Sequence, residues 1–166
     1  MPKRVRNMPR ADLDAIDRKI LTALQERARM PNVELARAVG LSPSPCLRRV
    51  RALEDSGVIR RYATLVDQSA VGLPVSVFVS VSLERQIESA LEEFETTVKA
   101  RPEVMECYLM TGTADYLLRI VISDLEAYER FLKEHLTRIS GVSSIQSSFA
   151  LKQIAYRTAL PLDASE

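Results

Sequence analysis

The residues best suited to chemistry lie between residues 42 and 59, where serine and arginine side chains recur at helical spacing. Ser44, Arg48 and Arg51 share one stripe of a helical wheel, and Arg49 lies at its edge. Arginine carries a fork of N–H donors that suits phosphate oxygens and the edge of guanine. We therefore predict a helix that binds DNA, in which the stripe reads bases. Arg49 is expected to contact phosphates instead.

The same stretch contains the signals that begin and end a helix. Ser42 can act as N-cap, and Pro43 and Pro45 fall in the first turn, where a missing N–H costs little. Gly57 is suited to follow the last turn. Four apolar residues predict the buried face of this helix, namely Cys46, Leu47, Val50 and Leu53.

Catalysis and metal binding have little support in the residue types. His135 is the only histidine, and the two cysteines, Cys46 and Cys107, stand at spacings unrelated to a zinc site. The sequence contains no Gly-x-Ser-x-Gly motif and no phosphate loop. We expect no catalytic residue, no metal and no cofactor, and we expect reduced thiols in a cytoplasmic protein. A redox role for Cys46 is the alternative to its burial in the apolar face.

The net charge of +1 conceals two halves of opposite sign. Residues 1–66 hold 14 Lys and Arg against 7 Asp and Glu, whereas residues 67–166 hold 9 against 15. The asymmetry favours a module that binds a polyanion joined to a module with another task. The basic stretch 1–10 is expected to be a flexible arm that adds attraction to phosphates. Scattered solvated charges are the alternative explanation.

The elements that must position the arginine stripe predict a helix-turn-helix. An amphipathic helix is expected over residues 12–28 with Asp12 as N-cap, and Asn32 is expected to cap a second helix that Gly40 ends. The stripe then stands on the third helix. Residues 58–65 alternate in polarity and predict a strand or hairpin, which would make the domain a winged one. An inert three-helix bundle is the alternative.

Two further groups complete the predicted DNA-binding set of this domain. Arg60 and Arg61 lie in the expected wing and would contact phosphates. Asn32 and Ser42 begin the two helices of the motif, and we include them in the same set.

The second half of the chain predicts an α/β pattern after a linker over residues 66–74. Strands are expected at residues 75–83, 104–110, 116–122 and 142–155, with helices at 87–98 and after Asp124. The order β-α-β-β-α-β predicts a ferredoxin-like sandwich with both helices on one face of the sheet. We therefore predict an α+β chain with an arm (1–10), a DNA-binding domain (11–65), the linker and a sandwich domain (75–166). Apolar residues on both faces of the strands favour a dimer.

Taken together, these segments resemble the Lrp/AsnC, or leucine-responsive, transcriptional regulators. The resemblance covers about residues 11–162. It includes Asn-Val-Glu-Leu-Ala at 32–36, Val-Gly-Leu-Ser-Pro-Ser-Pro-Cys-Leu at 39–47 and Asp-Tyr-Leu-Leu at 115–118. The remaining matching segments are residues 13–24, 49–50, 53–54, 57–59, 106–108, 111–112 and 147–152. No single motif is specific, but their common order and spacing are.

The resemblance implies an effector site in the second domain, beside the loop of residues 111–115. Asp115 would meet the amino group of an amino acid, and N–H groups around Gly112 would meet its carboxylate. A plain hairpin turn is the alternative reading of that loop. The implied effector-binding set is Leu109, Gly112, Thr113, Ala114, Asp115 and Leu125, with Ser148, Phe149 and Ala150 from a neighbouring subunit.

The identity of the effector stays open at this stage. Several family members carry bulkier residues where this chain has Ser147, Ser148 and Ala150. Apolar Leu109, Leu125 and Phe149 favour an apolar amino acid such as leucine.

The expected function is sequence-specific regulation of transcription in amino-acid metabolism, with DNA binding or assembly that responds to an amino acid. The expected partners are double-stranded DNA, the effector and further copies of the chain, as a homodimer that assembles to a tetramer or octamer. No membrane is expected as a partner, since the sequence has no long apolar run, and the expected location is the cytoplasm, in association with the nucleoid. Two alternatives are an architectural DNA-binding protein without effector and a sensor that controls an enzyme by direct contact.

Overall fold

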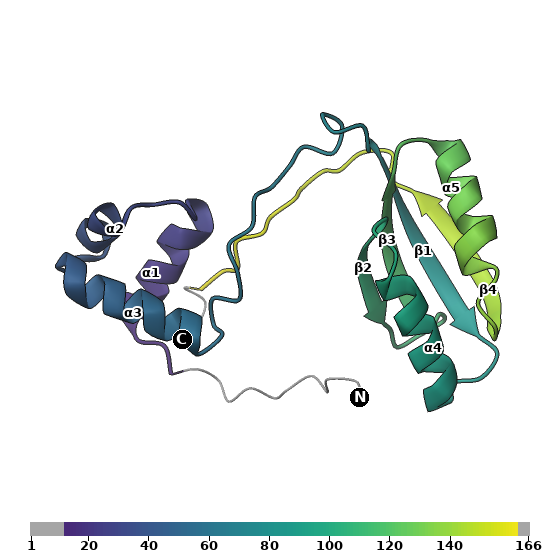
Figure 1. Ribbon diagram of the computed structural model, residues 1–166, viewed down its shortest axis with the longest axis horizontal. Helices are drawn as coiled ribbons and strands as arrows, with labels where there is room; N and C mark the ends of the chain where they lie inside the picture. The colour runs from purple at the N-terminus through teal and green to yellow at the C-terminus, as the bar shows by residue number, and fades with distance from the viewer. Residues whose placement is uncertain (1–11, 163–166) are drawn as a thin grey trace. The chain divides into compact units, whose positions relative to one another are not determined.

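The computed structural model describes residues 12–162, which form two compact units (Figure 1). One unit contains the described residues up to Leu65 together with the segment that begins at Ala155, and the other contains Val66–Ile154. The predicted basic arm, residues 1–10, lies outside the described residues. The sequence assigned residues 155–162 to the sandwich domain, whereas their contacts are with the first helix.

The first helix, α1, covers Ala15–Glu26 and begins one turn later than the sequence suggested. Its N-cap is Asp14, whose side chain accepts hydrogen bonds from the N–H groups of Ile16 and Asp17, at 2.9 and 2.8 Å. The Asp17 side chain accepts a bond from the Asp14 N–H in return, which completes a capping box. The prediction of Asp12 as N-cap was wrong, because this reciprocal pair satisfies the N–H groups of the first turn.

Helices α2 (Asn32–Val39) and α3 (Pro43–Asp55) follow, with Gly40 between them in the left-handed conformation. Ser42 is the N-cap residue of α3 and Pro43 opens its first turn, as predicted, although the Ser42 hydroxyl makes no capping bond. Asn32 is the first residue of α2 and caps nothing, so that prediction was wrong. Its amide donates instead to the Pro43 carbonyl oxygen at 2.8 Å and links the starts of the two helices.

The three helices enclose one apolar core. Leu35, Ala36 and Val39 of α2 are buried, as predicted, and so is Cys46 of α3. Leu47 is 39% exposed, which corrects its assignment to the buried face. Its position in the helix turns it towards the side that carries Arg48 and Arg51.

Residues 60–67 form no strand, so the predicted wing was wrong in its secondary structure. The chain leaves α3 through Gly57, and the Ile59 N–H donates back to the Leu53 carbonyl oxygen at 2.9 Å. The Tyr62 hydroxyl then donates to Glu54 at 2.8 Å. These contacts attach the segment to α3, and no strand of the described chain pairs with it.

The second unit is a four-stranded antiparallel sheet in the order β2-β3-β1-β4. Its elements are β1 (Val75–Leu83), α4 (Glu88–Lys99), β2 (Val104–Leu109), β3 (Tyr116–Ile122), α5 (Leu125–Phe131) with a π-helical turn (Leu132–Leu136), and β4 (Val142–Phe149). Both helices lie on one face of the sheet (Figure 1). The predicted α+β fold, a helix-turn-helix followed by a ferredoxin-like sandwich, is confirmed.

The two faces of the sheet differ in composition because side chains alternate along each strand. Val77, Val79 and Val81 of β1 are fully buried under the helices. The opposite face, which we call the open face, carries Phe78 at 39% exposure. The register places further residues beside it on that face, including Ser80, Leu117, Arg119, Gln146 and Ser148.

Strand β4 ends at Phe149 rather than at Ala155 as predicted. Its partner β1 begins at Val75, so the last bond between them runs from the Ala150 N–H to the Ser76 carbonyl oxygen, at 3.0 Å. Beyond that point β1 offers no backbone with which the chain can pair.

Candidate nucleic-acid and effector sites

The outer face of α3 presents the predicted base-reading residues together. Ser44, Arg48 and Arg51 are all exposed, and they line an open groove of about 520 Å³ along the helix. Leu47, Ala52 and Asp55 complete its lining. Arg48 and Arg51 make no ion pair within residues 12–162, and a helix with two such guanidinium groups on one side has the shape that enters a major groove.

Leu47 is a candidate contact residue that the sequence reasoning missed. It stands between Ser44 and Arg51 on the exposed side, and an apolar side chain there can contact the methyl group of thymine. The signal was available, since position 47 is three residues from 44 and four from 51. Its apolar type led to its assignment to the core.

Arg49 is engaged within the protein rather than free for phosphates. Its guanidinium lies 2.7 Å from Asp14 and 2.8 Å from Asp17, both at the start of α1. The Asp17 N–H and the Arg49 guanidinium both lower the pKa of the Asp14 carboxyl below its ordinary value. The ion pairs join α3 to α1, which fixes the helix that carries the predicted base-reading residues on its neighbour.

The other predicted DNA-binding residues fall into two groups. Ser42, Arg60 and Arg61 are exposed and accessible to a phosphate. Asn32 is half-buried and holds Pro43 through its amide nitrogen, while its Oδ1 atom is buried without a hydrogen-bond partner among the described residues. Asn32 therefore positions α3.

Asp115 is the one buried charged residue of the described chain, and it ends the loop between β2 and β3. Its Oδ2 atom accepts from the Leu83 N–H at 2.7 Å, and Oδ1 accepts from the Gln86 amide at 2.6 Å. Each carboxylate oxygen has a second lone pair, so the group retains acceptor capacity. Gln86 is a neighbour that no spacing in the sequence pointed to.

The rest of that loop is exposed. Thr111, Gly112 and Thr113 are open to solvent, and Ala114 is half-buried. Gly112 adopts φ +133°, a conformation that side chains rarely take, and a Cβ there would meet no atom within 4 Å. Leu109, at the end of β2, is also exposed. The loop is thus a surface beside one buried carboxylate, and the backbone N–H groups of residues 111–114 donate no hydrogen bond to the part of the chain that the structure describes.

Leu125 and Phe149 belong to a second group of predicted effector residues, at the start of α5. The Phe149 ring packs edge-on against Tyr128 with centroids 5.3 Å apart, and Leu125 lies one turn before Tyr128 at 64% exposure. The Tyr128 hydroxyl is hydrogen-bonded to Ser147. Ser148 points to the open face instead, since side chains alternate along β4.

The two groups lie at opposite corners of the sheet. Leu109 pairs with Tyr116, which pairs with Val81, which pairs with Ile145. Phe149 is four residues further along β4, so it stands about 13 Å along the strands and about 14 Å across them from Leu109. Within one chain the predicted effector residues therefore form two half-sites. We call Leu109–Asp115 the loop half-site and Leu125 with residues 148–150 the strand half-site.

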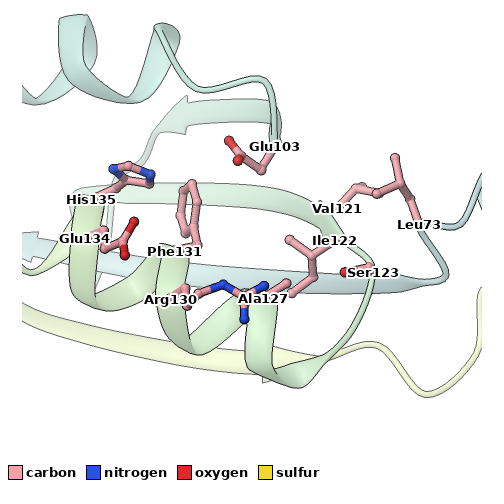
Figure 2. Close-up of a pocket in the computed structure, with 10 residues that line it drawn as sticks. All are labelled: Leu73, Glu103, Val121, Ile122, Ser123, Ala127, Arg130, Phe131, Glu134 and His135. Carbon is pink, nitrogen blue, oxygen red and sulfur yellow. The ribbon is translucent and has the colours of Figure 1, made fainter.

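A hollow of about 280 Å³ lies elsewhere in the sheet unit, between the end of β3 and α5 (Figure 2). Its lining includes Glu103, Phe131 and His135. One carboxylate oxygen of Glu103 is buried without a hydrogen-bond partner in the described chain, and His135 packs edge-on against Phe131. None of the predicted effector residues lines this hollow, so it is separate from both half-sites.

Among residues 12–162, no cluster of three potential metal ligands occurs. Within the same described residues, no helix is long and apolar enough to cross a membrane.

Two family models match the chain, and together they cover both units. Residues 13–60 match a winged helix-turn-helix DNA-binding domain. Residues 76–160 match the Lrp/AsnC ligand binding domain. The matches fall on the α3 groove in one unit and on both half-sites in the other.

The chain is also similar to characterised regulators over nearly its whole length. It is 49% identical to the Bkd operon transcriptional regulator of Pseudomonas aeruginosa, over 92% of this chain and 99% of that protein. It is 41% identical to the leucine-responsive regulatory protein of Escherichia coli, over 88% and 89% respectively. A crystal structure of a transcriptional regulator from Neisseria meningitidis in complex with L-Met superposes with a TM-score of 0.87 at 46% identity, covering 91% of this chain and 97% of that one.

Proposed function

The chain belongs to the Lrp/AsnC family of DNA-binding transcriptional regulators, and we propose that its binding to operators responds to an apolar amino acid held between copies of the chain. The family settles the class, a regulator and not an enzyme. The effector, the residues of both sites and the assembly are our proposals. So is the division into a DNA-binding domain (11–65), a linker (66–74) and a sandwich domain.

Operator reading is assigned to the outer face of α3. Arg48 and Arg51 would make bidentate contacts with guanine, and Ser44 and Leu47 would contact neighbouring base edges. Ser42, Arg60 and Arg61 would bind phosphates and fix the register of the domain on the duplex. The exposure of these side chains around one groove supports the assignment. We assign Arg49 and Asn32 to holding α3 in place, on the evidence of their contacts with α1 and with Pro43.

The effector site is proposed to form when the loop half-site of one copy meets the strand half-site of another. Asp115 would accept from the ammonium group of the ligand, and the N–H groups of Gly112 and Thr113 would bind its carboxylate. Leu109, Leu125 and Phe149 would contact its apolar side chain, with Ser148 and Ala150 beside them. The separation of the half-sites across the sheet is the observation that carries this proposal, because one chain cannot bring them to one ligand.

We propose leucine and methionine as the first effectors to test. The exposed apolar residues of the half-sites, Leu109, Leu125 and Phe149, suit an unbranched or branched aliphatic side chain. The relatives support the choice. One controls the Bkd operon, another is named leucine-responsive, and a third is described in complex with L-Met.

Dimerisation is proposed to occur through the open face of the sheet, which both helices leave uncovered. Phe78, Leu117 and Tyr108 supply apolar surface there, and serines of β1 and β4 allow close approach. Tetramers or octamers would follow as dimers meet at the half-sites. A DNA-binding regulator of this kind is expected in the cytoplasm, in association with the nucleoid.

The test combines thermal unfolding with light scattering and a gel shift. Each of the twenty amino acids is added in turn, and we expect leucine or methionine to raise Tm and to change the mass of the assembly. Binding to the DNA upstream of the chain's own gene is then measured with and without that amino acid. An architectural protein would bind DNA with no response to any of the twenty. A sensor that acts on an enzyme would bind an amino acid and leave the DNA unshifted.

A further inference from the structure

The last described residues of the chain lie against the first helix of the DNA-binding unit. The side-chain amide of Gln25 on α1 binds the backbone of Leu160 at both ends. Its Nε2 atom donates to the Leu160 carbonyl oxygen at 3.2 Å, and its Oε1 atom accepts from the Leu160 N–H at 2.6 Å. The side chain thus satisfies both the N–H and the C=O group of one residue, as a neighbouring β-strand does for its partner.

Two residues further on, the same segment enters the apolar core of that unit. Leu162 packs against the cluster that contains Ile20, Leu24 and Cys46. The guanidinium of Arg18, also on α1, donates to the Leu162 carbonyl oxygen at 3.0 Å. By contrast the Leu160 side chain is 70% exposed, so only its backbone is held. Leu160 and Leu162 are therefore held by Gln25 and Arg18 of α1 and by the apolar cluster that the three helices share.

The N-terminal end of α1, which carries Arg18, also holds α3. Arg18 follows Asp17, and Asp17 and Asp14 together bind Arg49 of α3. A continuous set of contacts thus runs from the C-terminal segment through α1 to the base-reading helix. At its other end the segment is covalently continuous with β4, whose last residues, Ser148 and Phe149, belong to the strand half-site together with the following Ala150.

We propose that residues 155–162 act as a clamp on the DNA-binding unit, which sets the position of α1 and α3 and carries the state of the effector site to them. The effector part of this proposal rests on the proposed function. From Ala150 to Leu160 the chain can span at most about 35 Å, so the segment limits how far the strand half-site and α1 can separate. Release of the clamp then changes operator binding even without effector.

The first test compares two leucines of the same segment. Leu162→Ser removes the side chain that packs in the core, and Leu160→Ser is the matched control because that side chain is exposed. We measure operator Kd without effector, with L-leucine and with L-methionine, and effector affinity by calorimetry. Leu162→Ser is expected to shift the effector-free Kd by about threefold or more and to reduce the effector response, with calorimetric affinity unchanged. Leu160→Ser is expected to match the unmodified chain.

A second variant guards against simple destabilisation of the core. Gln25→Leu removes both bonds to Leu160 while keeping the bulk of the side chain, and Glu26→Gln is the control on the adjacent exposed position. Amide exchange at Leu160 should rise in Gln25→Leu alone, and its operator Kd should move in the same direction as in Leu162→Ser.

Failure of the clamp proposal and failure of the proposed function would give different results. If Leu162→Ser and Gln25→Leu keep the Kd values and the effector response of the unmodified chain, the clamp proposal is overturned. If neither amino acid alters the unmodified chain, the proposed effector response fails, and the effector-free Kd values still decide the clamp.

Discussion

In the DNA-binding unit, the side chains proposed to meet the ligand stand on one exposed face of a single helix, α3, whereas in the sheet unit they are divided between two corners of the sheet. Helical periodicity alone brings Ser44, Arg48 and Arg51 together, because residues three and four apart share a face. The loop and strand half-sites are separated by three strand spacings, so we propose that another copy of the chain joins them. On this proposal the first site is a property of the fold, and the second is a property of the assembly.

This difference predicts that loss of assembly abolishes one site and spares the other. Phe78→Glu places a charge in the middle of the open face, beside an Arg119 that Glu106 already binds, so burial of the added carboxylate in the dimer costs several kcal/mol. We expect the dimer dissociation constant to rise about a hundredfold or more, with loss of amino-acid binding. Light scattering and calorimetry measure the two effects.

The control for that change is Ile87→Glu, at an apolar residue that is 53% exposed and precedes the first turn of α4. It should leave the dimer intact. A monomeric Phe78→Glu protein that still binds leucine or methionine with full affinity would show that one chain holds the effector and that the site does not require a second copy.

Removal of the arginines should have the reverse pattern, with loss of operator recognition and retention of effector binding. Each of Arg48→Ala and Arg51→Ala is expected to cost about 1–3 kcal/mol at the best operator and less on random DNA, if each contacts a base. Fluorescence anisotropy with both duplexes measures the ratio. Arg85→Ala, an exposed arginine of the sheet unit, is the control for charge alone. Equal losses on operator and random DNA would assign both arginines to phosphates.

A third change sharpens the role of Asp115 in the loop half-site. Asp115→Asn is expected to weaken amino-acid binding by about tenfold, since a hydrogen bond to a charged group contributes about 1.5–3 kcal/mol. Effector-free operator affinity should change little. Calorimetry with L-leucine and L-methionine provides the measurement.

Gln86→Ala is the matched control, because it removes one internal partner of the Asp115 carboxylate and leaves the charge in place. If this variant weakens amino-acid binding as much as Asp115→Asn does, then the carboxylate acts by holding the loop, and contact with the ligand is not required.

The sequence predicted local structure well and contacts between distant residues poorly. Periodicity placed the three helices of the DNA-binding unit and the strand and helix order of the sandwich, since both depend on neighbours in the chain. It could not show that Arg49 pairs with Asp14 and Asp17, which lie more than thirty residues away. It assigned Leu47 to the core by residue type, although its position faces the groove.

The errors at the ends of elements have a similar origin. Asp12 and Asn32 are good N-cap residues in isolation, but the capping box of Asp14 and the bond from Asn32 to Pro43 depend on the folded arrangement. The expected wing and the longer β4 both failed because a strand requires a partner, and alternation along the chain does not supply one. The residues 155–162 likewise gave no sign in the sequence that they would bind α1.

The smallest expected effect concerns Arg49, which the sequence grouped with the DNA contacts and the structure joins to α1. Arg49→Gln should lower Tm at neutral pH by a few degrees and change the ratio of operator to random-DNA affinity by less than about threefold.

The Asp17 N–H and Arg49 hold the pKa of Asp14 below its ordinary value of 3.8, so the stabilisation from the pair is present above that pH and is lost as the pH falls through the lowered pKa. Thermal unfolding curves of the variant and the unmodified chain should therefore converge as the pH falls below the lowered pKa of Asp14. Arg51→Gln, on the same helix with no ion pair among the described residues, is the control, and its Tm should match the unmodified chain throughout. If Arg49→Gln instead kept its Tm and lost affinity equally for operator and random DNA, Arg49 would be assigned to phosphate contacts. The DNA site would then extend around the edge of α3.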